Sequence, residues 1–194
     1  MKILNNRFLR NTSWLISSQI IQMIISLFIG MITARYLGPS NYGILNYTAS
    51  FTTFFTPLCT LGFNGIIVRE LVSKKELQGE TIGTCIVLRL CSSISSIIII
   101  LFLVKVLNSD DEVLLLVSVL QSLQLVFNTF DTIEYWFQAK LESKYTAIAR
   151  IISYSVVAIY KVTILVLGKD VVWFAFSNTL DVIVLALLFL LLYF

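Results

Sequence analysis

The stretch Thr33–Gly43 reads TARYLGPSNYG and closes an apolar run of about twenty residues, the length that crosses a bilayer as a helix. Glycine adopts left-handed backbone at little cost, and proline cannot continue the hydrogen-bond ladder of a helix. Gly38 and Pro39 therefore end the first helix, and Ser40 and Asn41 offer side-chain oxygens to cap the next one. The stretch predicts a tight hairpin between two membrane-spanning helices.

The whole chain has the composition of a membrane protein. Of its 194 residues, 58% are hydrophobic and 13% are charged, and the mean hydropathy is +0.91. Windows of about 20 apolar residues recur along it, and the connections between them are too short to form a soluble domain. The sequence thus predicts an all-α integral membrane protein with six transmembrane helices. The predicted spans are residues 12–34, 43–66, 82–104, 113–133, 150–168 and 172–194.

The basic residues of the connections predict the orientation in the membrane. Nine belong to one face: Lys2, Arg7, Arg10, Arg69, Lys74, Lys75, Lys140, Lys144 and Arg150. Three belong to the other: Arg35, Lys105 and Lys169. Because cytoplasmic connections are enriched in Lys and Arg, we expect the first face and both termini in the cytoplasm. Arg35 then lies at the outer interface, within the predicted hairpin.

Several classes of function lack their usual residues in this sequence. There is no histidine, which is the commonest ligand of catalytic zinc and the commonest general base. Cys59, Cys85 and Cys91 lie within predicted spans, where we expect them to act as small apolar side chains. No GxxxxGK[ST] motif occurs, and the basic residues lie at helix ends, not on one common face as a nucleic-acid-binding protein would place them. The sequence therefore predicts a protein that is not an enzyme, with no metal, no cofactor and no nucleic-acid partner.

Polar residues recur at helical spacing in two of the predicted spans, so they share one face of each helix. The first span carries Gln19, Gln22, Ser26, Gly30 and Thr33. The fourth span carries Gln121, Gln124, Asn128 and Asp131. A polar face avoids lipid, so two interpretations remain open: the faces border one cavity, or they pack helix against helix through small residues and amide hydrogen bonds.

Three charged residues lie deep in the predicted spans. Arg89 accompanies serines on one side of the third span, and an arginine at that depth either faces a substrate path or extends toward the cytoplasmic interface. Lys161 and Asp181 lie about equally far on either side of the predicted turn between the last two helices. They form a buried ion pair, or else Asp181 is a protonatable carboxylate whose partner changes between states. Glu134 is expected to be a solvated charge at the inner interface.

Two segments resemble motifs of a known family. Ala34–Gly43 (ARYLGPSNYG), followed by Leu61–Phe63 (LGF) and Arg69–Leu71 (REL), is similar to the N-terminal signature of the Wzx-type polysaccharide flippases. Glu134–Tyr145 (EYWFQAKLESKY) resembles the segment those proteins carry between helices four and five, although the aromatic triplet is shifted and Ala139 replaces a glycine. These flippases belong to a superfamily that also includes multidrug antiporters.

The resemblance implies a two-lobe transporter, of which this chain is the N-terminal six-helix lobe, the C-terminal lobe being absent from the sequence. It implies movement of a polyprenyl-pyrophosphate-linked oligosaccharide across the bacterial inner membrane for synthesis of O-antigen or capsule. The bilayer and the second lobe are then the partners of the chain. Two alternatives stay open: a multidrug or metabolite cation antiporter of the same superfamily, and a membrane-embedded glycosyl polymerase or transferase.

Overall fold

The computed structural model describes residues 2–108 and 111–193, and the described residues form helices and short connections with no β-strand. The helices are α1 (Lys2–Thr60), α2 (Asn64–Ser73), the 3-10 turn η1 (Lys75–Leu77), α3 (Gln78–Leu107), α4 (Glu112–Ser122), α5 (Gln124–Phe127), the 3-10 turn η2 (Asn128–Asp131), α6 (Thr132–Ala139), α7 (Ser143–Val166) and α8 (Val171–Tyr193). The predicted all-α class is confirmed.

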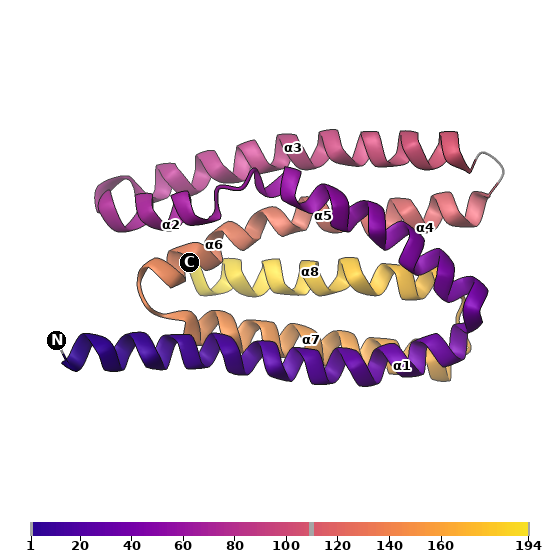
Figure 1. The fold of residues 1–194 in the computed structure, drawn as a ribbon, viewed down its shortest axis with the longest axis horizontal. Coiled ribbons are helices and arrows are strands. Elements are labelled where there is room, and N and C mark those ends of the chain that lie inside the picture. The colour runs from indigo at the N-terminus through magenta and orange to yellow at the C-terminus, as the bar shows by residue number, and fades with distance from the viewer. Residues whose placement is uncertain (1, 109–110, 194) are drawn as a thin grey trace.

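The predicted hairpin is present as a reversal of α1 at a single residue. Gly38 has φ 70° and ψ 175°, a backbone conformation that is nearly exclusive to glycine. Figure 1 shows α1 running along one edge of the molecule, turning at this point and returning toward α2. The second half resumes directly at Pro39, so Ser40 and Asn41 lie in its first turn. Within residues 2–108, no backbone N–H donates to either side chain, and the predicted caps are wrong. Proline suits this first position because its missing N–H has no helical acceptor there.

The described helices make six passes, as the sequence predicts. Five stretches are long and apolar enough to cross a membrane: Leu9–Ser73, Gln78–Leu107, Glu112–Ala139, Ser143–Val166 and Val171–Tyr193. The first contains 65 residues and, if straight, would measure about 98 Å, against roughly 30 Å of hydrocarbon. The reversal at Gly38 divides it into two passes.

The second pass is broken near its end and not merely kinked. Leu61 and Gly62 both have left-handed backbone, with φ values of 54° and 64°, so α1 ends at Thr60 and α2 begins at Asn64. The Oγ of Ser92 on α3 donates to the carbonyl oxygen of Leu58 at 2.9 Å. The same carbonyl oxygen accepts from the N–H of Leu61 at 3.2 Å, so a neighbouring helix adds a second donor near the break.

The later passes extend beyond their predicted spans. Helical torsions at the joints connect α4, α5, η2 and α6 into one rod, which continues to Ala139 and not to residue 133. The fifth pass, α7, begins at Ser143 and not at residue 150. A hydropathy window ends at the first charged residues, whereas a helix continues as long as its backbone hydrogen bonds and packing continue. Arg150 is therefore inside a helix.

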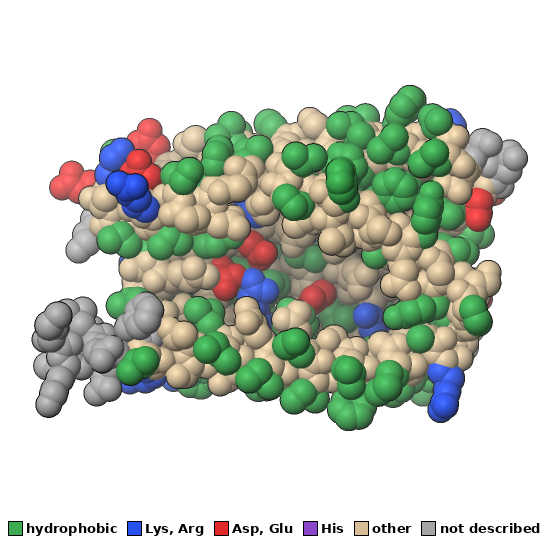
Figure 2. All heavy atoms as spheres, in the orientation of Figure 1, with side chains coloured by type: hydrophobic (Ala, Val, Ile, Leu, Met, Phe, Trp, Pro, Cys, Tyr) green, Lys and Arg blue, Asp and Glu red, His purple; other side chains and the backbone are tan. Residues whose placement is uncertain are grey.

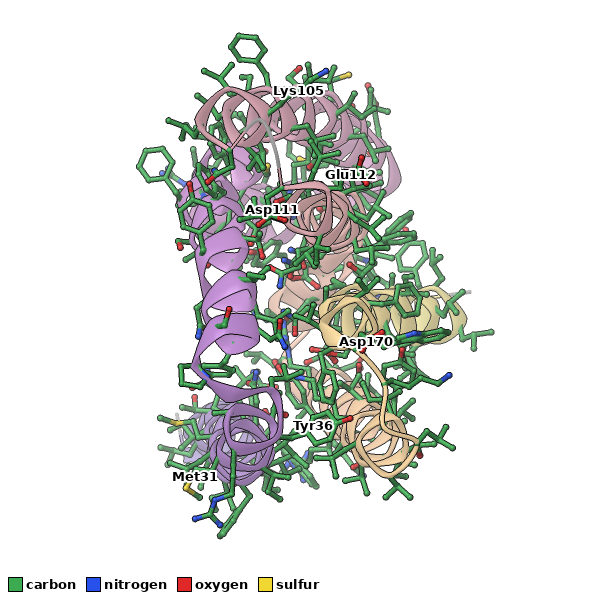
Figure 3. All side chains as sticks on the ribbon, turned by 90° about the vertical axis from the view of Figure 1, so that its right-hand side faces the viewer. Met31, Tyr36, Lys105, Asp111, Glu112 and Asp170 are labelled. Atoms are coloured by element: carbon green, nitrogen blue, oxygen red, sulfur yellow. The ribbon has the colours of Figure 1, made fainter. Side chains whose placement is uncertain are left out.

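The passes stack in layers with apolar surfaces outward. Figure 1 shows α3 and the second half of α1 at the top, the α4–α6 rod and α8 in the middle, and α7 with the first half of α1 below. Figure 3 views the end that carries Tyr36, Asp111 and Asp170, so the three connections predicted to share a face do so. Large apolar side chains such as Phe54 and Leu191 remain 72% and 76% exposed, as expected where lipid replaces water.

Candidate functional site

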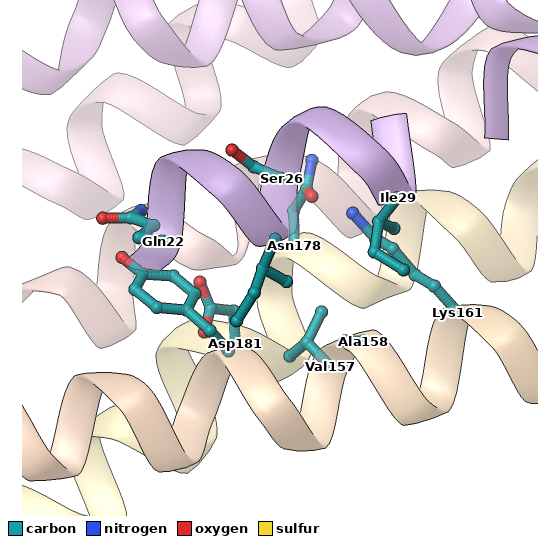
Figure 4. A pocket seen from close by; sticks show the side chains of 10 residues that line it. Gln22, Ser26, Ile29, Val157, Ala158, Lys161, Asn178 and Asp181 are labelled. Atoms are coloured by element: carbon teal, nitrogen blue, oxygen red, sulfur yellow. The ribbon is translucent and has the colours of Figure 1, made fainter. Parts of the chain in front are cut away.

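Two adjoining cavities of about 180 and 150 Å³ lie between α1, α4, α7 and α8. The polar residues that line the first are Gln22, Ser26, Tyr154, Lys161, Asn178 and Asp181. The polar residues that line the second are Thr33, Tyr42, Asn46, Gln121, Lys161 and Asn178, beside Gly30 and Phe174. Because Lys161 and Asn178 belong to both linings, we treat the two spaces together as the central cavity. Figure 4 shows its first part from close by.

The polar face predicted for the first helix lies along the central cavity. Gln22 and Ser26 line the first part, and Gly30 and Thr33 line the second. Gln19 is exposed and belongs to neither lining. The packing interpretation therefore does not account for most of this face, since a cavity occupies the space beside it.

The polar face predicted for the fourth pass divides into two parts. Gln121 is in the wall of the central cavity, where its Nε2 donates to the carbonyl oxygen of Leu45 at 3.3 Å and its buried Oε1 has no partner. Gln124 instead donates to the Oγ1 of Thr52 at 3.3 Å, across to α1. The carbonyl oxygen of Asn128 accepts from Arg89. Gln124 and Asn128 serve helix packing, while Gln121 borders the cavity.

Arg89 is buried between helices and is in neither lining of the central cavity. Its side chain is 2% exposed; Nη1 donates to the Oγ1 of Thr132 at 2.8 Å, and Nη2 donates to the carbonyl oxygen of Asn128 at 3.3 Å. It does not extend to the cytoplasmic interface. The carbonyl oxygen of Asn128, at the start of the 3-10 turn η2, is within reach of an arginine on α3. The guanidinium therefore joins α3 to the fourth pass.

Lys161 and Asp181 line the same cavity, but they are not an ion pair. The ion pairs within 4 Å in the described ranges 2–108 and 111–193 are Lys74–Glu70 and Arg150–Glu134. Asp181 accepts a hydrogen bond from the Oγ of Ser153, and Figure 4 shows Lys161 at the other end of the cavity. The ion-pair interpretation is therefore wrong for this state. Equal distance from the turn gives Lys161 and Asp181 a similar depth in the membrane, but it does not bring their side chains into contact.

The buried ion pair joins Glu134 of α6 to Arg150 of α7, and neither residue was predicted as part of a site. Glu134 is 7% exposed and also accepts from the Nε2 of Gln138 at 3.4 Å, so it is not a solvated interface charge. Asp131 precedes Glu134 by one helical turn and shares its face. Figure 2 shows acidic and basic side chains together in a hollow between the lower and middle layers.

A signal for part of this site was present in the sequence. Arg150, Tyr154, Val157 and Lys161 follow one another at three- and four-residue spacing, which places them on one face of α7. Asn178 precedes Asp181 by three residues on α8. The predicted span began at residue 150 and so placed Arg150 at the membrane interface. For that reason Arg150 was not recognised as part of the polar face of α7.

The central cavity offers binding groups and not a catalytic constellation. Its wall supplies amides, hydroxyls, one ammonium and one carboxylate, which are groups that hold a polar ligand through hydrogen bonds. In the part of the chain that the structure describes, no group of three or more His, Cys, Asp or Glu side chains could hold a metal ion.

Comparison with known proteins gives one match, and it covers nearly the whole chain. No curated protein and no solved structure matches the sequence. A family model described as polysaccharide biosynthesis protein matches residues 8–194. The match includes all six passes and every residue that lines the central cavity. The chain therefore belongs to the polysaccharide biosynthesis protein family.

Proposed function

We propose that this chain is part of a flippase that moves lipid-linked oligosaccharide units across the bacterial inner membrane. Its family serves polysaccharide biosynthesis, and the members are mainly transporters. A lipid-linked oligosaccharide combines a polyprenyl chain, which is stable in lipid, with sugars that are costly to transfer into hydrocarbon. The protein has to supply a polar path for the sugars, while the tail stays in the bilayer. No covalent chemistry is needed.

The observation that carries this proposal is the central cavity itself. Polar and charged side chains from four helices face a shared space in the middle of a helical bundle whose outer surface is apolar. Polar groups inside a membrane protein commonly mark a substrate or ion path. The exposed apolar side chains provide the surface along which a polyprenyl chain can remain.

The two alternative functions have less support from the structure. A cation antiporter needs a cavity of net negative charge, but here Lys161 shares the wall with Asp181. A glycosyl polymerase or transferase needs a catalytic segment outside the bilayer, but the outer connections are the reversal at Gly38, residues 108–111 and residues 167–170. None of these segments is long enough to build an active site.

The proposal includes orientation and assembly. Arg150 pairs with Glu134 two turns into α7; without it, eight basic residues lie near the helix ends of one face against three at the other. That bias still favours a cytoplasmic location for the face that carries both termini. Figure 1 places both termini toward the same end. A second, similar lobe is the expected partner for alternating access.

Gene deletion and reconstitution test the proposal together. Removing the gene from its host should abolish surface polysaccharide and cause the repeat-unit lipid to accumulate, and the wild-type gene should restore export. The complete protein in liposomes should move the purified repeat-unit lipid to the far leaflet, where a membrane-impermeant glycosidase can cleave it. Unchanged polysaccharide in the deletion strain, together with no translocation in liposomes, would refute the flippase proposal.

A further inference from the structure

We propose that the central cavity binds an uncharged sugar ring of the transported lipid and does not bind the pyrophosphate. The inference rests on the proposed function and assigns a specific part of that substrate to a specific site. The charge, the hydrogen-bonding groups and the shape of the cavity wall each point to a sugar.

The charges of the wall disfavour a pyrophosphate. Among the described residues that line the cavity, Lys161 is the one cation and Asp181 is the one carboxylate. The guanidiniums of Arg150 and Arg89 do not line the cavity: Arg150 pairs with Glu134, and Arg89 donates to the fourth pass through Nη1 and Nη2, with its Nε buried and unpartnered within residues 2–108 and 111–193. A pyrophosphate beside Lys161 would also meet the carboxylate of Asp181, and repulsion between like charges is strong where water is scarce. A neutral ligand avoids this cost.

The uncharged groups of the wall suit a ligand with many hydroxyls. The amides of Gln22 and Asn178 each offer both donors and acceptors, and Tyr154 adds a phenolic hydroxyl. The Ser26 hydroxyl donates to the carbonyl oxygen of Met23 at 3.1 Å and so offers only its acceptor. Gln121 lies behind this wall with its side chain fully buried, so its Oε1 is not exposed to the cavity. A phosphate oxygen can only accept, whereas each sugar hydroxyl both donates and accepts. The wall therefore matches a polyol better than it matches an anion.

The shape of the wall supports the same ligand. Tyr42 borders the second part of the cavity, beside the ring of Phe174, which is itself buried in the core. A sugar ring carries an apolar C–H face that packs against aromatic rings, in addition to its hydroxyls. The two parts, about 180 and 150 Å³, together reach the lower end of small-molecule pockets, roughly 300 Å³.

Binding measurements on the complete protein in lipid nanodiscs test the assignment. The probes are the repeat-unit lipid extracted from the host and the corresponding polyprenyl pyrophosphate without sugar. Asn178→Leu and Lys161→Met should each weaken binding of the sugar-bearing lipid about tenfold, the effect expected from losing hydrogen bonds to a ligand. Binding of the sugar-free lipid should be unchanged. Gln124→Met is the matched control, because Gln124 bonds to α1 outside the cavity and its loss should change neither affinity.

Three other results would contradict the sugar assignment, the flippase proposal or both. If Lys161→Met weakens binding of the sugar-free lipid as much as that of the repeat-unit lipid, the pyrophosphate occupies the cavity and the inference is wrong. If the wild-type protein translocates the repeat-unit lipid but Asn178→Leu has unchanged affinity for it, the sugar inference fails while the flippase proposal stands. If the wild-type protein neither binds nor translocates either lipid, both proposals fail.

Discussion

Replacing Arg150 with glutamine leaves Glu134 buried without its cation, and we expect this change to destabilise the protein strongly. Glu134 has a side chain that is 10% exposed, and that of Arg150 is 25% exposed. The remaining donor to Glu134 is Gln138, at 3.4 Å. Asp131 lies one turn earlier on the same face. Arg150→Gln therefore strands the buried carboxylate of Glu134 beside another acidic residue.

The exposures of the pair set the magnitude. Breaking a fully buried ion pair costs about 3–5 kcal/mol, while an exposed pair contributes about 0–1 kcal/mol. Partial exposure of Arg150 places this pair at the low end of the fully buried range, so we expect Arg150→Gln to cost about 3 kcal/mol. At about 2–4 °C per kcal/mol for a chain of this size, the melting temperature should fall by about 6–12 °C. Glu134→Gln should cost less, because Asp131 remains near Arg150.

Thermal unfolding of the purified protein, followed by size-exclusion chromatography after heating, measures these changes. The double variant Glu134→Gln with Arg150→Gln should cost less than the sum of the two single variants, since it removes both members of the pair. Lys74→Gln is the control: its pair with Glu70 is 58% and 40% exposed, and its loss should lower the melting temperature by less than about 2 °C. Strictly additive losses, or equal effects of Arg150→Gln and Lys74→Gln, would refute the reasoning.

Three further predictions concern the reversal, the topology and Arg89. Gly38→Ala should lower the free energy of unfolding by about 1–3 kcal/mol, because alanine is strained at the backbone torsions of residue 38. Gly43→Ala is the control and should not destabilise the protein, since no atom lies within 4 Å of the added Cβ; thermal unfolding measures both variants. With the native cysteines replaced, a cysteine at exposed Glu112 should react with an impermeant thiol reagent outside intact cells and one at exposed Glu142 should not; reversed labelling would invert the orientation. Arg89→Gln should lower the amount of protein in the membrane because Arg89 joins two helices, while transport per remaining molecule is preserved. If the variant inserts normally but does not transport, Arg89 belongs to the substrate path after all.

Local physical chemistry explains what could be predicted for the fold. The hairpin follows from the torsions that glycine permits and the hydrogen bond that proline lacks, and both are properties of one or two residues. At the break after Thr60, glycine explains the left-handed backbone of Gly62, but no local property of Leu61 indicates that it would share this conformation. Helix ends were predicted less well, since the start of α7 at Ser143 depends on packing against other passes and not on hydropathy alone.

The sequence by itself determined the membrane class, the six passes and the polar face of the first helix, because hydropathy and helical periodicity add up along a single segment. Only the tertiary structure decided which charges meet. Arg150 pairs with Glu134, Arg89 donates to Thr132, and Lys161 remains apart from Asp181 across a cavity. Helical spacing gives the face on which a side chain lies, but the rotation and neighbours of that helix come from the packing of all six passes. Packing therefore makes Arg150 and Glu134 an ion pair and leaves Lys161 and Asp181 unpaired with each other in the wall of one cavity.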